Sequence, residues 1–575
     1  MLPENEHDTA NVLERKQLSE LILTQATDIA VIPITTSWTD LPQKQISAEI
    51  LKLSEELLEY EYALIPEGLH VIGKKKSMNA TLDMLKSMAQ LSVETTLEDA
   101  VFVDIAKGVS PAEMILAHQL GKIENIHKIM TDLQTACQLM QMDSELDGLM
   151  KALDGRYIRP APGGDVLHNL EVLPTGRNLH GFDPFRIPSQ YAVKDGAQQA
   201  QRILDRHLAD AQALPESIAL VLWGTDNLKT EGAPIAQVLA LLGAQPRFDS
   251  YGRLAGATLI PLEKLGRPRI DVVISISGIF RDLMPLQIKL LAEAALLAAN
   301  AEEPIEQNFV RKHALDYMNR MGCDMETAAL RVFGNADGTY GANVNLLVDN
   351  SKWEDEEELS NTYIKRKGFA YGVNGKPQLQ KTELLSSIFA DVSLTYQNLD
   401  SIELGVTTID TYFDTLGGIS QAVKTAKGGI ASPVYIGDQT SGKGTVRTLN
   451  EQVNLETRTR MLNPKWYEGM LQHGFEGVRQ IETHVTNTFG WSATTGQVQP
   501  WVYQQITETF VLDDQMRERL AELNPSATAK VANRLLEASA RKYWNPSPED
   551  LAKLRQFAEE LEDRLEGVYQ GVAIS

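Results

Sequence analysis

Cysteine is scarce in this chain of 575 residues: it has only Cys137 and Cys323, which lie far apart in the sequence. This spacing excludes a disulfide framework and a thiolate metal site, and it suits a protein of the reducing cytoplasm. Long hydrophobic runs are absent as well, because no stretch of about 18 apolar residues occurs that would predict a transmembrane helix. The acidic start, residues 1–8, has neither the basic nor the apolar region of a signal peptide.

Positive charge is also in deficit. The 54 Lys and Arg residues stand against 77 Asp and Glu, which gives a formal net charge of -23. Such a surface repels phosphate backbones and anionic lipids, so we expect neither nucleic acid nor a membrane surface as a partner. A length of 575 residues exceeds one hydrophobic core, and about two to four domains are expected.

Three motifs of common enzymes and metal sites are missing. The sequence contains no H-E-x-x-H, no G-x-S-x-G and no C-x-x-C. Zincins, α/β-hydrolases and zinc ribbons are therefore unsupported as function classes.

The hydrophobic pattern divides the chain into four regions. Residues 1–150 are predicted to be helical, because apolar side chains recur on one stripe in segments such as 51–62. Residues 151–190 form an irregular segment rich in Pro, Gly and Arg, and long irregular segments in folded proteins are often functional. Residues 191–440 alternate strands and helices, and residues 441–575 are mainly helical.

This alternation predicts an α/β fold, with a parallel-sheet domain between large helical N- and C-terminal regions. The predicted elements are strands at 217–224 and 270–277 and helices at 197–208, 233–242 and 286–299. Ligands bind at the carboxyl ends of parallel strands. The loops that follow the two strands, Gly224–Gly232 and Ser277–Asp282, are therefore candidate binding segments.

Each of these loops has a functional and a structural interpretation. Gly224–Gly232 can bind an anion at the next helix N-terminus, but it lacks G-x-G-x-x-G, so a dinucleotide site is weakly supported and the alternative is a plain strand-to-helix connection. Arg281 either holds a ligand carboxylate by a bidentate contact or pairs with Asp282 to cap a helix.

A third glycine-rich segment, Gly437–Thr445, nearly matches the phosphate loop G-x-x-x-x-G-K-[ST]. We expect it to follow a strand and precede a helix, as phosphate loops do. Gly444 occupies the hydroxyl position, however, and Thr445 comes one residue late. The alternatives are nucleotide binding and a flexible turn.

Three further residues are candidates for metal or proton handling. His313 lies near the predicted start of a helix, beside Arg311 and Lys312, whose charges favour its neutral form. Asp410 and Asp414 are four residues apart and share a face if they are helical, where they can take protons or a hard cation. The alternatives are a hydrogen-bonded structural histidine, and a helix-capping aspartate beside a solvated one.

A basic and aromatic patch stands out in the acidic C-terminal region. Guanidinium groups and flat rings suit a large, planar, anionic ligand, and the alternative is an interdomain packing seam. The members of the patch are Arg458, Arg460, Lys465, Trp466, Tyr467 and His473.

Several long segments resemble one family, the large tetrapyrrole-binding H subunit of magnesium chelatase and its cobalt chelatase relatives. The similarity follows the chain in order from Glu67 to Trp544. Its main motifs are Leu173-Pro-Thr-Gly-Arg-Asn178, Arg267-Pro-Arg-Ile-Asp-Val272, Phe309-Val-Arg-Lys-His-Ala-Leu315, Gly338-Thr-Tyr-Gly-Ala-Asn-Val-Asn345, Leu462-Asn-Pro-Lys-Trp-Tyr-Glu-Gly-Met-Leu471 and Gly490-Trp-Ser-Ala-Thr494.

The resemblance implies a porphyrin-binding part of the subunit that inserts Mg²⁺ into protoporphyrin IX in (bacterio)chlorophyll synthesis. ATP would be used by separate ATPase subunits I and D, in agreement with the imperfect phosphate loop. It implies propionate contacts by Arg177, Arg281 and Arg458, with Trp466 and Tyr467 beside the ring. Metal or proton handling would fall to His313, Asp410 and Asp414, and no metal ligand is assigned.

Two departures from the family pattern keep other interpretations open. Members are roughly twice this long, so the chain resembles a C-terminal half without the family's H-x-G-x-H-G-x-x-E segment, and Thr411 replaces a histidine common in relatives. A separate N-terminal half is therefore a possible partner. The alternatives are a cobalt chelatase homologue, a non-catalytic tetrapyrrole-binding scaffold, and an unrelated α/β enzyme that binds a nucleotide at Gly437–Thr445.

Overall fold

The protein is described by a computed structural model. It covers residues 9–28, 36–38, 41–66, 68–93, 97–162, 164, 166–167, 169–179, 182–440 and 444–567. The acidic start of the chain and residues 441–443 of the predicted phosphate loop lie outside the described residues.

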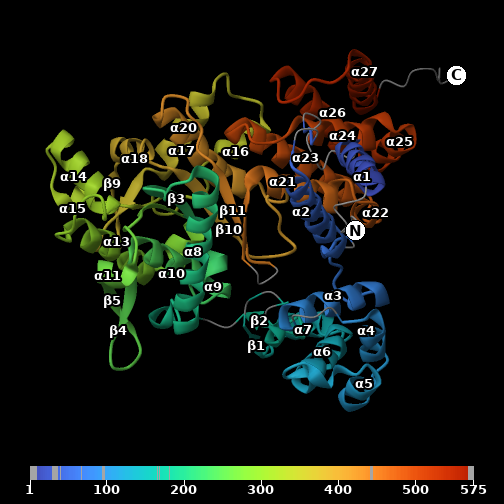
Figure 1. Cartoon of the computed structure of the whole chain (residues 1–575), viewed down its shortest axis with the longest axis horizontal. Coiled ribbons are helices and arrows are strands. Elements are labelled where there is room, and N and C mark those ends of the chain that lie inside the picture. Colours follow the sequence, from blue (N-terminus) through green and yellow to red (C-terminus); the bar gives the residue numbers. More distant parts are fainter. Residues whose placement is uncertain are drawn as a thin grey trace.

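An eight-stranded sheet lies in the middle of the molecule (Figure 1). Its order is β12-β11-β10-β3-β6-β7-β8-β9. The inner strands from β11 to β7 run parallel, while β12, β8 and β9 are antiparallel to their neighbours. The bounds are β3 (Ser217–Leu222), β6 (Asp271–Ile276), β7 (Val332–Gly334), β8 (Phe369–Tyr371), β9 (Pro377–Gln380), β10 (Leu394–Leu399), β11 (Val434–Asp438) and β12 (Thr445–Thr448).

Helices cover both faces of this sheet (Figure 1). On one face α8, α10 and α13 pack together, and on the other α17, α18 and α20 do so. A hairpin of β4 and β5 extends from the first face. These elements and their neighbours are α8 (Gln190–Ala211), α10 (Ala233–Leu242), β4 (Ala244–Phe248), β5 (Leu254–Leu259), α11 (Leu262–Leu265), α13 (Pro285–Asn300), α14 (Phe309–Met321), α15 (Met325–Ala328), α17 (Glu356–Lys367), α18 (Thr382–Phe389) and α20 (Gly418–Ala426).

The predicted α/β fold with a parallel sheet is confirmed. Strands β3 and β6 consist entirely of buried residues, as expected for central strands covered on both faces. Helices α10 and α13 match the predicted helices to within a residue at each end.

A small helical body lies beside the sheet domain (Figure 1). It has its own hydrophobic core, which runs from Leu85 to Leu173. The boundary expected at residue 150 falls inside α7, and the irregular segment contributes Leu167 and Leu173 to this core. The elements of the body are α3 (Met78–Ser92), α4 (Asp99–Ala106), α5 (Pro111–Ala117), α6 (Ile126–Met140), α7 (Glu145–Leu153), β1 (Pro160–Ala161) and β2 (Asn178–Leu179).

The C-terminal region is a helical bundle, and the first helices of the chain pack against it (Figure 1). Tyr60 of α2 lies beneath the guanidinium of Arg458 at 5.7 Å, and Glu59 pairs with Arg447 of β12, the neighbouring edge strand of the sheet. The helices are α1 (Thr9–Asp28), α2 (Gln43–Tyr62), α21 (Leu449–Glu456), α22 (Pro464–Leu471), α23 (Phe475–Thr495), α24 (Pro500–Thr507), α25 (Asp514–Leu523), α26 (Pro525–Ala540) and α27 (Pro548–Leu565).

The prediction that a helix directly follows the glycine-rich segment is wrong. The segment joins β11 to β12, two antiparallel strands, so no helix N-terminus follows it. Gly437 lies within β11, and a Cβ there would collide with the hydroxyl of Tyr396. Close strand packing therefore explains this glycine, and the described part of the segment lacks the strand-to-helix turn that cradles a phosphate.

His313 belongs to a buried ionic network at the amino ends of the strands. Asp271 is the first residue of β6. One of its carboxylate oxygens accepts a hydrogen bond from Nε of Arg331 (2.7 Å), and the other is hydrogen-bonded to Nδ1 of His313 (2.9 Å). Nε2 of His313 lies 3.4 Å from Glu216. Burial alone would lower the pKa of His313, but the hydrogen bond and charge of Asp271 raise it overall. The geometry is that of a structural network that anchors α14 to β6.

This network predicts a pH-dependent contribution of His313 to stability. A histidine whose pKa is raised by folding stabilises the fold fully below its unfolded pKa, about 6.5, and the contribution disappears as pH rises through the folded pKa. We expect His313→Gln to lower stability by about 1–3 kcal/mol at pH 6 and by less at pH 9. Urea denaturation at the two pH values measures this, and an equal loss at both would contradict it.

A candidate site at the carboxyl edge of the sheet

The carboxyl ends of the parallel strands meet along one edge, here called the carboxyl edge. The chain proceeds from β3 to β6 and β7 on one side of β3, and returns to β10 and β11 on the other side. Connections therefore leave β3 and β10 in opposite directions, which makes their junction the switch point where open α/β sheets bind ligands. The short helices of this edge are α9 (Gly224–Lys229), α12 (Gly278–Leu283), α16 (Val344–Asp349) and α19 (Asp410–Tyr412).

The ends of β3 and β6 are joined by Ser277. Its hydroxyl accepts hydrogen bonds from the backbone N–H groups of Gly224 and Phe280, both at 3.1 Å. A Cβ at Gly224 would meet the backbone of Phe280 at 2.7 Å, so only glycine permits the two turns to approach this closely. The result is a rigid base for the polar residues above it.

Arg281 lies in α12 and is held by the loop that follows β7. Its Nη1 donates to the carbonyls of Ala336 (2.7 Å) and Thr339 (2.8 Å), and its Nε donates to Asp282 (2.7 Å). The expected ion pair with Asp282 is thus present, and that contact lowers the pKa of the Asp282 carboxyl. Its other terminal nitrogen, Nη2, is buried and has no hydrogen-bond partner among the described residues.

Tyr340 covers this arginine and faces solvent. The guanidinium of Arg281 lies 5.1 Å from the ring centroid, and the Tyr340 hydroxyl donates to Asp282 at 2.5 Å. The ring packs on Gly278, where any Cβ would collide with it. Because 54% of Tyr340 is exposed, it presents a fixed aromatic surface at the carboxyl edge.

Asp414 and Asp410 both bind the segment Gly338–Asn345, but in different ways. Asp414 is buried in a π-helical turn and accepts backbone hydrogen bonds from Ala342 (2.7 Å), Val344 (2.7 Å) and Asn345 (3.1 Å). Burial raises its pKa, and those hydrogen bonds oppose the shift. Asp410 is exposed and accepts one bond, from the side-chain amide of Asn345 (2.6 Å). Asp414 thus orders the start of α16, whereas Asp410 is open to a ligand.

Asp226 lies at the switch point, in the first turn of α9. It is 6% exposed, and its Oδ1 is 3.4 Å from the hydroxyl of Thr225. Its Oδ2 is buried and without a hydrogen-bond partner in the described part of the chain, as is Nε1 of Trp223 in the same turn. Burial and the charge of Asp400, which follows β10, raise the pKa of Asp226 to about 7.

In the basic and aromatic patch of the C-terminal region, Arg458 and Trp466 make contacts with aromatic side chains of the protein itself. Arg458 lies over the rings of Trp501 (4.3 Å) and Tyr60 (5.7 Å), and burial lowers its pKa. Trp466 is buried edge-on against His484, with ring centroids 4.7 Å apart. The contact of Arg458 with Tyr60 is that of a packing seam between α2 and the bundle, whereas Trp466 belongs to the bundle's own core.

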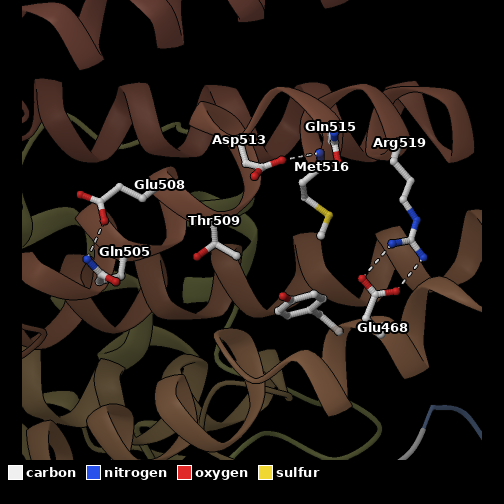
Figure 2. A pocket seen from close by; sticks show the side chains of 9 residues that line it. Glu468, Gln505, Glu508, Thr509, Asp513, Gln515, Met516 and Arg519 are labelled. Carbon is white, nitrogen blue, oxygen red and sulfur yellow. Dashed lines mark hydrogen bonds and ion pairs between the residues drawn. The ribbon is translucent and has the colours of Figure 1, made fainter. Parts of the chain in front are cut away.

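Tyr467 lines an open cavity of about 480 Å³ between the helices of the bundle. Figure 2 shows Glu468 and Arg519 paired at one end of it, joined by two hydrogen bonds of 2.8 Å. Glu508 and Asp513 also line the cavity. Its acidic lining disfavours a ligand with carboxylates.

Arg177 lies in the small body, away from the sheet. Its guanidinium donates to the carbonyls of Pro174 (2.9 Å), Leu173 (2.8 Å) and Glu171 (2.5 Å). The structure therefore brings Arg281, Asp410 and Asp414 together at the carboxyl edge. It places His313 at the opposite edge, and it places Arg177, Arg458, Trp466 and Tyr467 in other parts of the molecule.

Within the described ranges, no three His, Cys, Asp or Glu side chains are grouped so that they could hold a metal ion. None of the helices that the structure describes is both long and apolar enough to cross a membrane.

Comparison with known proteins identifies the family. The profile of CobN/Magnesium Chelatase matches residues 4–551. The chain belongs to this family. Over 558 residues it is 54% identical to the magnesium-chelatase H subunit of Cereibacter sphaeroides, and this match covers 96% of the chain and 42% of the relative. The corresponding protein of Rhodobacter capsulatus is 56% identical over 523 residues, 91% of the chain and 40% of the relative.

The fold also matches a solved member of the family. The catalytic subunit of cobaltochelatase from Mycobacterium tuberculosis superposes with a TM-score of 0.87 at 31% identity, over 95% of this chain and 49% of that one. The chain therefore spans less than half the length of the relatives it matches. The predicted family is confirmed, and the roles predicted for individual residues stay predictions.

The two aspartates of the Asp410–Asp414 segment should differ in their effect on stability. Asp414→Asn leaves buried N–H groups without an anionic acceptor, so we expect a loss of about 2–4 kcal/mol. Asp410→Asn, on the surface, should change stability by less than about 1 kcal/mol. Urea denaturation of the two variants measures the difference, and equal effects would contradict the assignment of Asp414 to loop ordering.

Proposed function

We propose that this chain is the porphyrin-binding, carboxyl-terminal portion of the large subunit of a magnesium chelatase, acting in the cytoplasm in (bacterio)chlorophyll synthesis. The observation that carries this proposal is the 54% identity to a magnesium-chelatase H subunit across nearly the whole chain. The identity to the cobaltochelatase protein is 31%. Magnesium is therefore favoured over cobalt as the substrate ion.

The reaction replaces the two pyrrole N–H protons of protoporphyrin IX by Mg²⁺. Magnesium gives up its water ligands reluctantly, so insertion requires oxygen ligands that replace water and a supply of energy. We assign the use of ATP to separate subunits I and D, and the remaining part of the large subunit to a further polypeptide segment. This chain would then hold the planar ring and direct proton removal.

The carboxyl edge is the surface we assign to the porphyrin. Four large apolar side chains are exposed on its segments, although such groups are usually buried. They are Ile279, Leu283, Tyr340 and Leu346. A flat aromatic ring such as Tyr340 offers a porphyrin a face for offset stacking.

Two arginines flank this ring and suit the propionate groups. Nη2 of Arg281 and Nε of Arg366 are buried, and no hydrogen-bond acceptor within the described residues pairs with them. Arg366 also donates to the carbonyl of Tyr340 at 2.8 Å. A carboxylate that displaces Asp282 from Arg281 would gain a charge-assisted, bidentate contact. Arg366 was not among the residues predicted from the sequence.

Asp410 is the residue of this edge that we assign to the substrate ion. Its carboxylate is exposed and has a single hydrogen bond, to Asn345 at 2.6 Å, so it can exchange that bond for a hydrated cation. Asp414 would act indirectly, by fixing the loop that carries Tyr340.

Porphyrin titration tests the assignment of the binding surface. Saturable fluorescence quenching of deuteroporphyrin is expected with this chain, and Tyr340→Ala should weaken binding about 5–30-fold, which corresponds to the loss of roughly 1–2 kcal/mol of stacking. The matched control is Tyr251→Ala, an 81% exposed tyrosine at the β4–β5 turn, which should bind as the unmodified chain does.

A second variant separates the two candidate surfaces. If Arg458→Ala weakens binding more than Tyr340→Ala does, the porphyrin lies in the bundle and the carboxyl edge is the wrong surface. If the complete chelatase inserts Co²⁺ and not Mg²⁺, the chain is a cobalt chelatase homologue. If porphyrin binds but neither ion is inserted, the scaffold interpretation replaces the enzymatic one.

A further inference from the structure

One buried carboxylate of the carboxyl edge has an oxygen that no described residue satisfies. Most of the buried charged groups that the structure describes are satisfied: Glu456, for example, accepts bonds from Val406 (2.7 Å), Thr407 (2.9 Å) and Gln452 (2.9 Å). Asp226 differs, because its Oδ2 is enclosed without a hydrogen-bond partner from any described residue. An unsatisfied buried carboxylate is costly, and a role in chemistry is one explanation for its retention.

The position of Asp226 supports such an explanation. It follows the end of β3, and Asp400 follows the end of β10, so the two carboxylates flank the switch point from neighbouring parallel strands. The rings of Trp223 and Tyr412 pack against each other in this region, with centroids 5.3 Å apart, and Tyr412 lies near both aspartates. The indole N–H of Trp223 is also without a described partner, which leaves both a donor and an acceptor available in one turn.

The charges around Asp226 come from several elements. Lys229 of the same helix favours the ionised form, and Asp400 favours the protonated form. Tyr412 of α19 faces both aspartates, and their charges and its own burial keep its hydroxyl protonated. In α12, which packs on α9, Arg281 and Asp282 neutralise each other at 2.7 Å. Among the neighbouring charges, that of Asp400 therefore has the largest effect on the ionisation of Asp226.

We propose that Asp226 and Asp400 form a proton-accepting pair at the switch point that takes up one of the two protons released when Mg²⁺ enters the porphyrin. This rests on the proposed function. A pyrrole N–H bond breaks, its electron pair binds the metal, and the proton forms an O–H bond at Oδ2 of Asp226. The second proton passes to solvent water. One proton shared between two nearby carboxylates is stable because both cannot ionise at low cost.

The raised pKa suits this task. A carboxyl group that titrates near pH 7 is ionised often enough to accept a proton and releases it again after turnover. The sequence predicts the loop Gly224–Gly232 as a candidate binding segment but does not single out Asp226, because only the strand order shows that Asp400 lies beside it.

The first test uses this chain alone and does not depend on chelation. With ¹³C-labelled aspartate, NMR should detect one carboxyl that titrates near pH 7, absent in Asp226→Asn. The matched control Asp205→Asn removes an exposed aspartate of α8 and should retain that signal. In Asp400→Asn the titration should move to lower pH, because the like charge is removed. If no aspartate titrates between about pH 6 and 8, the pair does not exist and the proposal is overturned.

The second test uses the complete chelatase, with all its subunits. The rate of Mg²⁺ insertion should rise with pH through an apparent pKa near 7. Asp226→Asn should lower kcat about 10²–10⁴-fold and abolish this acid limb, with porphyrin affinity unchanged. In Asp400→Asn the limb should shift to lower pH, which a merely structural role would not cause.

The outcomes separate this inference from the proposed function. An Asp226→Asn enzyme that keeps the acid limb and its rate would overturn the proton-accepting role while the chelatase assignment stands. A chain that shows the titrating aspartate, but whose complete chelatase inserts no Mg²⁺, would overturn the proposed function and with it the source of the proton.

Discussion

The strand order of the central sheet is the constraint on which the rest of the site depends. Because β10 returns to the side of β3 away from β6, the carboxyl ends of β3 and β10 are neighbours whose connections diverge. Loops that leave in opposite directions cannot cover the gap between them. The polar residues of the carboxyl edge are thus gathered by topology, from segments far apart in the sequence.

Around this edge several buried polar side chains are hydrogen-bonded to the backbone of neighbouring elements, and these bonds make the edge rigid. Ser277 joins two strand ends, Asp414 holds the N-terminus of α16, and Arg281 ties α12 to the loop after β7. Each is a charged or hydroxyl group enclosed with its partners, which fixes geometry at modest net energy. Against this background the groups that stay unsatisfied or exposed, such as Oδ2 of Asp226, Nη2 of Arg281 and the ring of Tyr340, are the ones we assign to function.

Prediction from the sequence succeeded where local pattern decides the structure. The apolar runs of β3 and β6 and the helices α10 and α13 were predicted closely, because burial imposes their composition. The family was also evident from motifs distributed along the chain. Of the candidate residues, Arg281, Asp410 and Asp414 meet at one edge because each follows a strand of the parallel sheet.

The sequence could not predict features that depend on distant partners. His313 resembled a ligand, yet its partner Asp271 begins a strand and holds it at the opposite edge. Gly437 resembled a phosphate-loop glycine, but glycine is needed there because the side chain of Tyr396 on the next strand leaves no room for a Cβ. Asp226 and Asp400 become neighbours only through the pairing of β3 with β10, which no local pattern encodes.

Hydrogen exchange measured by mass spectrometry, with and without deuteroporphyrin, tests most directly whether the carboxyl edge is the porphyrin surface. Binding should slow exchange in the loop 335–345 and in α12, with little change at α22, α24 and the acidic cavity of the bundle. Protection confined to the bundle helices, with the carboxyl edge unchanged, would contradict the account.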